Sequence, residues 1–272
     1  MKSLRALNDF GARHAAAAVV TQSGRTELAG DLEYRFPLAS VTKLFVAYCA
    51  LIAYEEHTLA LNDAAGPPGS TVAHLLAHAS GLAPDLPPRP IAAPGTRRIY
   101  SSAGFEVLSD LIAEASGLSI GEYLSVGVFE PLGMLDADLE GSPASGALAT
   151  IEDCVAFSRE LLSPTLISRS TLRFATSVAF SGLSGVLPGF GIQDPNDWGL
   201  GFEIRDEKSP HWTGGSNSPA TFGHFGQSGT FVWVDPNAHA ACVLLTDRDF
   251  GDWAIDAWPR FSDEILAELA SA

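Results

Sequence analysis

The sequence predicts an α+β fold in which an antiparallel β-sheet is flanked by N- and C-terminal helices and carries an inserted, mostly helical subdomain. Extended, β-rich segments occur near both ends of the chain, a long apolar helix follows the first of them, and helical patterns fill the middle. Because terminal strands need partners, we expect both ends to pair in one sheet. The prediction is a single domain over 1–272, with an α/β part at about 1–60 and 190–272 and a helical part at about 61–189.

The N-terminal segment predicts a short helix at 3–14 and then a β-hairpin. The apolar run at 15–22 is followed by a turn at Ser23-Gly24-Arg25 and by a second extended piece that ends near Phe36. From Ser40 to His57, apolar residues recur at helical spacing, and nearly all side chains after Lys43 are nonpolar. We therefore expect a buried helix here.

The remaining elements follow from turn residues and periodicity. Residues 61–98 are rich in Pro and Gly around one short helix at 71–81, and further helices are expected around 105–117, 118–132 and 150–162. Two β-rich runs at 230–236 and 240–247 are joined by a Pro-Asn turn, and a C-terminal helix at 252–269 is expected to kink at Pro259.

Composition narrows the class of protein. A chain of 272 residues with 46% hydrophobic residues can bury a large core. Its 32 acidic and 16 basic residues give a formal charge of -16, which argues against nucleic acid and anionic membranes as partners. Without a secretory signal or a membrane-spanning apolar run, we expect a cytoplasmic protein of undetermined oligomeric state. Three widely separated cysteines in apolar surroundings are expected in the core: Cys49, Cys154 and Cys242.

Ser40 and Lys43 form an S-x-x-K motif at the start of the apolar helix. A spacing of three residues places both side chains on one helical face, within reach of each other. Serine becomes a nucleophile when a base removes its proton, and a lysine serves as that base when desolvation lowers its pKa. The alternative is that Ser40 caps the helix and Lys43 is a solvated residue of its first turn.

Five segments together resemble the penicillin-recognising serine hydrolases, namely class C β-lactamases, D-Ala-D-Ala carboxypeptidases and related esterases. Their order and spacing agree over most of the chain. The segments are PLASVTKLFVAYCALI around Ser40, HLLAHASGL at 74–82, GTRRIYSSAGFEVLSDLI at 95–112, EPLGM at 130–134 and GHFGQSGTFVWVDP at 223–236.

The resemblance implies that Ser40 is acylated and that Lys43 and Tyr100 share the role of base. Tyr100 matches the tyrosine of the Y-x-N motif and would need neighbouring cations to lower its pKa; the alternative is an ordinary half-buried tyrosine. Ser102 replaces the asparagine of that motif, as a substrate contact or as the cap of the following helix. The backbone N–H groups of Ser40 and Gln227 would form the oxyanion hole.

His224-Phe225-Gly226 occupies the place of the family's K-T-G or H-T-G triad, and these residues are predicted to bind substrate. His224 would supply a donor or a positive charge, or tune Tyr100, unless it is simply a packed strand residue. Phe225 replaces a threonine hydroxyl with an apolar ring, which removes a polar contact used for carboxylate-bearing substrates.

No cofactor or metal is predicted. His74 and His78 have the i, i+4 spacing of zinc ligands, but the H-E-x-x-H glutamate and a third ligand are missing. Trp198 is expected in the core or in a pocket wall.

The predicted function is a serine hydrolase that acts on a small-molecule ester, amide or β-lactam. An ester or small amide is favoured, with weak penicillin turnover as a side activity, because Ser102 and Phe225 depart from the family pattern and no export signal is evident. The alternative is a penicillin-recognising binding protein that has lost catalysis.

Overall fold

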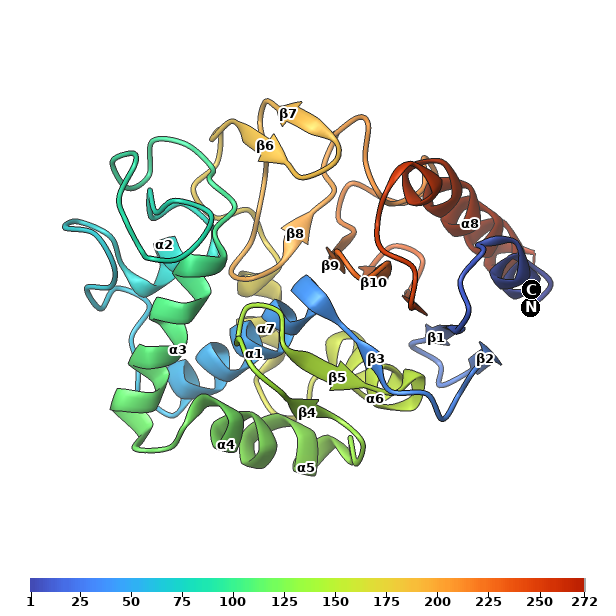
Figure 1. The fold of residues 1–272 in the computed structure, drawn as a ribbon, viewed down its shortest axis with the longest axis horizontal. Helices are drawn as coiled ribbons and strands as arrows, with labels where there is room; N and C mark the ends of the chain where they lie inside the picture. The colour runs from blue at the N-terminus through green and yellow to red at the C-terminus, as the bar shows by residue number, and fades with distance from the viewer. Residues whose placement is uncertain (272) are drawn as a thin grey trace.

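A six-stranded antiparallel sheet combines strands from the two ends of the chain (Figure 1). The computed structural model describes residues 1–271. In the sheet, β1 and β11 are neighbours, with Ala18 opposite Val243, which confirms the expected pairing of the chain ends. The strand order is β2 (Thr26–Gly30), β1 (Ala15–Thr21), β11 (Ala240–Thr246), β10 (Thr230–Asp235), β9 (Phe222–Gly226) and β8 (Glu203–Ile204).

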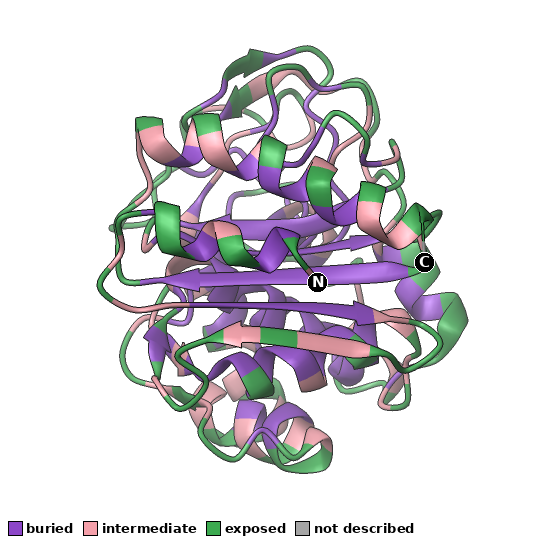
Figure 2. Cartoon of the chain, turned by 90° about the vertical axis from the view of Figure 1, so that its right-hand side faces the viewer, coloured by how far each residue is buried: buried purple, intermediate pink, exposed green. Residues whose placement is uncertain are grey.

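Both faces of the sheet are covered, so β10 and β11 are buried along their whole length and β1 is buried except at its two end residues (Figure 2). One face packs against η1 (Ser3–Asp9) and α8 (Asp252–Ala270), and the other against α1 (Thr42–Glu55) and α6 (Ile151–Leu162). Alternate residues of β10 divide between the two cores: Val232 faces the α1 side, while Phe231 and Trp233 face the α8 side. Burial on both faces explains why these strands are continuous apolar runs.

The middle of the chain forms the helical part and two small sheets. The helices are α2 (Val72–Leu76), α3 (Ser102–Ser116), α4 (Ile120–Leu124), the π-helical η3 (Ser125–Phe129), α5 (Glu130–Leu132), α6 and α7 (Arg169–Ala175). One small sheet has the order β3 (Phe36–Pro37), β5 (Ala147–Ala149) and β4 (Asp138–Leu139), and the other pairs β6 (Gly185–Leu187) with β7 (Gly191–Gln193). These short pairings were not predicted.

Several element boundaries differ from the sequence-based expectation. The first helix is a 3-10 helix that ends at Asp9, and Gly11 with a φ of 65° then redirects the chain into β1. The α1 helix begins at Thr42, because Ser40 lies in a preceding 3-10 turn, η2 (Ala39–Val41). The α8 helix runs through Pro259.

The three cysteines are buried in the core and unpaired, as expected. Within residues 1–271, no helix is both long enough and apolar enough to cross a bilayer.

Candidate active site

Ser40 lies on a tight turn that is held against the end of the main sheet. The preceding Ala39 has a φ of 45°, in the left-handed region. The hydroxyl of Thr230 donates to the Leu38 carbonyl at 2.9 Å, and that of Ser228 donates to the Pro37 carbonyl at 2.5 Å. The β9–β10 hairpin therefore fixes the backbone on which the serine is presented.

Gly226 allows this close approach. A Cβ atom at this position would lie 2.4 Å from the Leu38 carbonyl oxygen and 2.5 Å from the Thr230 hydroxyl. A glycine therefore lets β9 end directly beside the turn that carries Ser40.

Lys43 reaches Ser40 from the first turn of α1. Its Nζ donates to the Ser40 Oγ at 3.2 Å and to the Ala144 carbonyl at 2.8 Å, and the side chain is fully buried. Burial lowers the pKa of Lys43 to about 7, although the nearby Glu106 carboxylate opposes the shift. A lysine with this pKa has a large neutral fraction near pH 7 and can accept a proton. The solvated alternative for Lys43 is therefore wrong.

A short chain of hydrogen bonds holds the Ala144 carbonyl in place. The Ala144 N–H donates to the Ser142 Oγ at 3.1 Å, and the Ser142 hydroxyl in turn donates to Glu106. Sequence reasoning missed these residues.

Tyr100 stands beside the serine and the lysine. The Lys43 Nζ lies 4.9 Å from the centroid of the Tyr100 ring. Burial raises the pKa of Tyr100 above its ordinary value, and a hydrogen bond with Ser40 opposes the shift only in part. The cation-lowered pKa that a phenolate base requires is therefore not found, and Tyr100 remains a neutral phenol near pH 7.

His224 faces Tyr100 as a neutral ring. Its Nδ1 donates to the Phe225 carbonyl at 2.7 Å, and its Nε2 lies 3.5 Å from the Tyr100 hydroxyl. Burial, together with the charge of Lys43, lowers the pKa of His224 to about 3. The positive charge considered for this histidine is therefore absent at neutral pH, and the unprotonated Nε2 is an acceptor.

The two histidines with zinc-like spacing have different surroundings. His78 packs with its ring centroid 4.6 Å from that of Tyr100, and its Nδ1 accepts a hydrogen bond from the Ser101 N–H. His74 contacts Thr71 and Phe180 instead. Among residues 1–271, no group of three His, Cys, Asp or Glu side chains is arranged to hold a metal ion.

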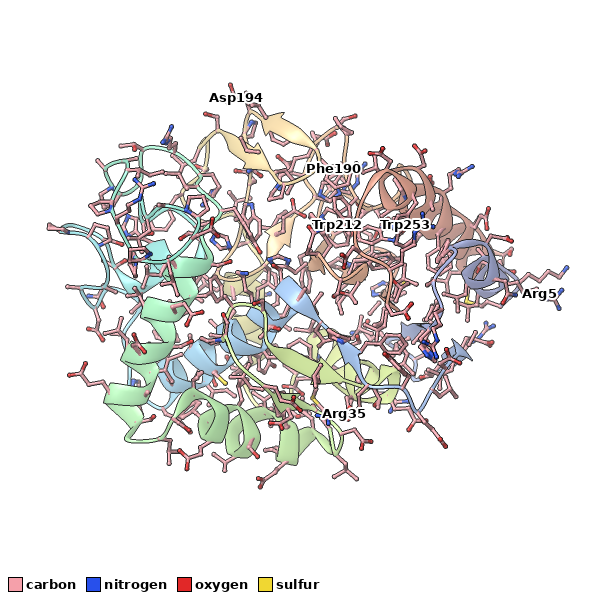
Figure 3. All side chains as sticks on the ribbon, in the orientation of Figure 1. Arg5, Arg35, Phe190, Asp194, Trp212 and Trp253 are labelled. Atoms are coloured by element: carbon pink, nitrogen blue, oxygen red, sulfur yellow. The ribbon has the colours of Figure 1, made fainter. Side chains whose placement is uncertain are left out.

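A cavity of about 90 Å³ opens at Ser40. Phe225 forms part of an apolar wall together with Trp198, which is almost completely buried and so belongs to both the core and the pocket. Phe190, labelled in Figure 3, packs edge-on against Phe225 and belongs to the same apolar cluster as Trp212. The lining residues are Ser40, Tyr100, Leu187, Pro188, Trp198, Glu203, His224, Phe225 and Gln227.

Both residues predicted to form the oxyanion hole line the cavity, and one predicted substrate contact lies elsewhere. Ser40 is in the first turn of η2, where N–H groups have no acceptor one turn earlier, and Gln227 follows β9 directly and lines the cavity. Ser102 does not line the cavity. It is the first residue of α3, and the cap of that helix is Ser101, whose hydroxyl accepts from the Gly104 N–H at 3.0 Å.

Glu203 is a buried carboxylate in the cavity wall that sequence reasoning did not find. It accepts hydrogen bonds from Lys208, from His211 Nε2 at 2.9 Å and from Trp212 Nε1 at 2.8 Å. Burial alone would raise the pKa of Glu203, but His211 and Lys208 hold it at about 2. Lys208 thus forms a buried salt bridge with Glu203. Among the described residues, no lysine or arginine lines the cavity.

The fold, with a serine at the start of a buried helix beside an antiparallel sheet, is that of the β-lactamase and transpeptidase class of proteins. Residues 3–265 match the family model for β-lactamase, and the chain belongs to this hydrolase family.

Solved structures and curated relatives agree with this assignment. A crystal structure described as a β-lactamase from Mycobacterium bovis is 53% identical, with a TM-score of 0.96 over 98% of this chain and 99% of that chain. EstCE1, described as a hydrolase with promiscuous acyltransferase activity, shares the fold at 15% identity, with a TM-score of 0.78 over 97% of this chain and 96% of that one.

The D-alanyl-D-alanine-carboxypeptidase/endopeptidase AmpH of Escherichia coli is 28% identical over 142 residues. The match covers 39% of this chain and only 37% of AmpH.

Proposed function

We propose that this protein is a serine acyl hydrolase that forms an acyl-enzyme on Ser40. The observation that carries the proposal is the contact between the Lys43 Nζ and the Ser40 Oγ at 3.2 Å, made by a fully buried lysine whose pKa is about 7. A binding protein that merely kept both residues would not need a desolvated lysine. A lysine that acts as a general base near pH 7 does need desolvation, because desolvation lowers its pKa.

In the acylation step, neutral Lys43 removes the proton from the Ser40 hydroxyl while Oγ forms a bond to the acyl carbon. The backbone N–H groups of Ser40 and Gln227 stabilise the oxyanion of the tetrahedral intermediate. As the bond to the leaving group breaks, Tyr100 donates its phenolic proton to the leaving oxygen and recovers a proton from protonated Lys43. Lys43, rather than Tyr100, is therefore the base in this scheme.

Deacylation uses the same groups in reverse. A water molecule loses a proton to neutral Lys43 and attacks the acyl carbon, and the Ser40 Oγ leaves and takes that proton back from protonated Lys43. His224 places its unprotonated Nε2 3.5 Å from the Tyr100 hydroxyl, where it limits the rotation of the phenolic O–H before the proton is transferred to the leaving group.

The favoured substrate is a small, uncharged ester or amide. The cavity at Ser40 has a volume of about 90 Å³, which suits a short acyl group, and an adjoining cavity of about 330 Å³ shares Tyr100 and Pro188 with it. Its wall is apolar at Phe225, and it contains the Glu203 carboxylate but no free cation. A substrate carboxylate, as in penicillins or D-Ala-D-Ala peptides, would find no lysine or arginine among the described residues that line this cavity.

Rates on three substrates test the proposal. We expect kcat/KM to be highest for 4-nitrophenyl acetate, lower by about tenfold or more for a chromogenic cephalosporin and lower still for a D-Ala-D-Ala peptide. Ser40→Ala should abolish all three activities. Efficient turnover of the cephalosporin alone would overturn the ester preference, and no acylation by any substrate would favour a binding protein.

A further inference from the structure

A second cavity lies at the opposite end of β9 from the active site. Its volume is about 320 Å³, within the range of small-molecule sites, which begins at roughly 300 Å³. Phe222 at the start of β9 lines this cavity, whereas Gly226 at the end of the strand lies beside Ser40. We call it the α7 cavity; its lining residues are Gln22, Leu161, Leu162, Pro164, Arg169, Leu172, Arg173, Thr176, Phe222, Val234, Pro236 and His239.

One face of α7 forms a wall of the α7 cavity. Arg169, Leu172, Arg173 and Thr176 follow the i, i+3, i+4, i+7 pattern, so their side chains share that face. Both arginines are exposed, and neither forms a salt bridge with another residue of 1–271. Their guanidinium groups are therefore available to a ligand.

The inner surface of the α7 cavity is apolar. Phe222 and Val234 are paired across β9 and β10 and are buried in the main core, as is Leu161 at the end of α6. Pro164 and Pro236 have no side-chain polar groups and complete the rim. A ligand that enters between them exchanges water for hydrocarbon on most of its surface.

The charges of the lining residues are all of one kind. The whole chain has 32 acidic and 16 basic residues, yet the lining of the α7 cavity includes Arg169 and Arg173 and no acidic residue. This local reversal favours an anion. Two guanidinium forks one helical turn apart match a carboxylate, which accepts paired hydrogen bonds from arginine.

We propose that the α7 cavity binds a free fatty carboxylate of medium chain length, with its tail against Phe222 and Val234 and its carboxylate on Arg169 and Arg173. A concave site with an apolar interior accommodates a free tail, whereas a membrane headgroup would need only the charged rim. The proposal does not depend on acylation of Ser40, because the two cavities share no lining residue.

Calorimetric titration of the full chain with decanoate, at concentrations up to about 1 mM, tests the proposal. We expect saturable binding of one decanoate per chain. The double variant R169Q/R173Q should weaken it about tenfold or more, while leaving the binding of 1-decanol unchanged. Thr176→Phe should fill the cavity and block both ligands. R5Q/R260Q is the matched control, because it removes the same charge from exposed sites; Arg5 points away from the molecule in Figure 3.

Four results would overturn the proposal. They are no binding of decanoate by the wild-type chain, an equal loss in R5Q/R260Q, binding of anionic phospholipid vesicles without binding of decanoate, and dimerisation through this surface without binding of decanoate. Thermal unfolding of each variant, monitored by circular dichroism, establishes that a loss of binding reflects the site and not the fold. Hydrolysis of 4-nitrophenyl acetate should be unchanged in R169Q/R173Q.

Discussion

The ammonium nitrogen of Lys43 lies 2.8 Å from the carbonyl oxygen of Ala144, a residue 101 positions further along the chain. This contact gives the buried lysine a second acceptor besides Ser40. Ala144 belongs to a loop that is attached to α3, because the Ala144 N–H donates to the Ser142 Oγ and the Ser142 hydroxyl donates to Glu106. The helix with the proposed base is thus linked to the helix that follows Tyr100.

Replacing Glu106 with Gln should shift the pH profile of hydrolysis. The Glu106 carboxylate raises the pKa of Lys43, so its removal should lower that pKa below about 7. Because the neutral lysine is the active form, the acid limb of kcat/KM should move to lower pH, by about half a unit. Glu114→Gln, at an exposed position of the same helix, is the control and should leave the profile unchanged. A shift to higher pH would contradict this arrangement.

Lys43→Met should change the pH dependence of stability. Lys43 has a pKa of about 7 in the folded protein and an ordinary value of 10.5, so between these values the unfolded chain binds more protons. The free energy of unfolding of the wild type, relative to K43M, should therefore rise by about 2 kcal/mol from pH 7 to pH 9. Urea unfolding of both proteins at three pH values measures it. A flat difference would mean that Lys43 titrates as a solvated lysine.

The same variant should lose activity about 10²- to 10⁴-fold, the contribution of a positioned general base. Lys43→Arg is the informative partner, because arginine keeps a positive charge but does not release its proton near pH 7. We expect K43R to be as inactive as K43M in hydrolysis of 4-nitrophenyl acetate. Substantial activity in K43R would assign the base to another residue.

Tyr100→Phe should lower kcat about 10²-fold with little change in KM, because the phenol acts on the leaving group in the transition state. Burial raises the pKa of Tyr100, so the wild type should also show no alkaline change in rate from this residue up to pH 10. Tyr54→Phe, at an exposed position on α1, serves as the control. A limb of the rate profile near pH 7 that disappears in Tyr100→Phe would instead support Tyr100 as a phenolate base.

Phe225→Thr should change substrate preference more than overall activity. The substitution removes an apolar wall that Phe190 and Phe250 support and places a hydroxyl beside His224. We expect the ratio of kcat/KM for a carboxylate-bearing cephalosporin to that for 4-nitrophenyl acetate to rise about tenfold. An unchanged ratio would show that the wall at Phe225 does not select against carboxylates. A melting temperature for F225T establishes that the core has tolerated the change.

The elements with strong local patterns were predictable. The apolar run after Lys43 predicts a buried helix, and the β-rich runs at 230–236 and 240–247 predict buried strands. The structure has α1, β10 and β11 at these positions. The position of Ser40 was found because its partner Lys43 is three residues away. The 3-10 turn at Ala39 was missed, because its conformation depends on hydrogen bonds from Ser228 and Thr230, nearly 200 positions later.

Local sequence patterns could not identify residues whose role depends on partners with no characteristic spacing in the sequence. Glu203 lines the cavity, and its ionisation depends on Lys208 and His211, a set with no characteristic spacing. Similarly, the pKa values of Tyr100 and His224 follow from how completely the folded chain excludes water, which composition does not reveal. For this reason the sequence did not predict that the pKa of Tyr100 is raised by burial instead of lowered by a neighbouring cation.

Intact-mass spectrometry after exposure to a fluorophosphonate probe tests the central claim most directly. Wild-type protein should gain the mass of one phosphonyl group, peptide mapping should place it on Ser40, and the rate of labelling should increase with pH through about 7 as Lys43 loses its proton. Ser40→Ala should gain no mass. Labelling that persists in Ser40→Ala, or a labelling rate that is independent of pH between 6 and 8, would contradict the account.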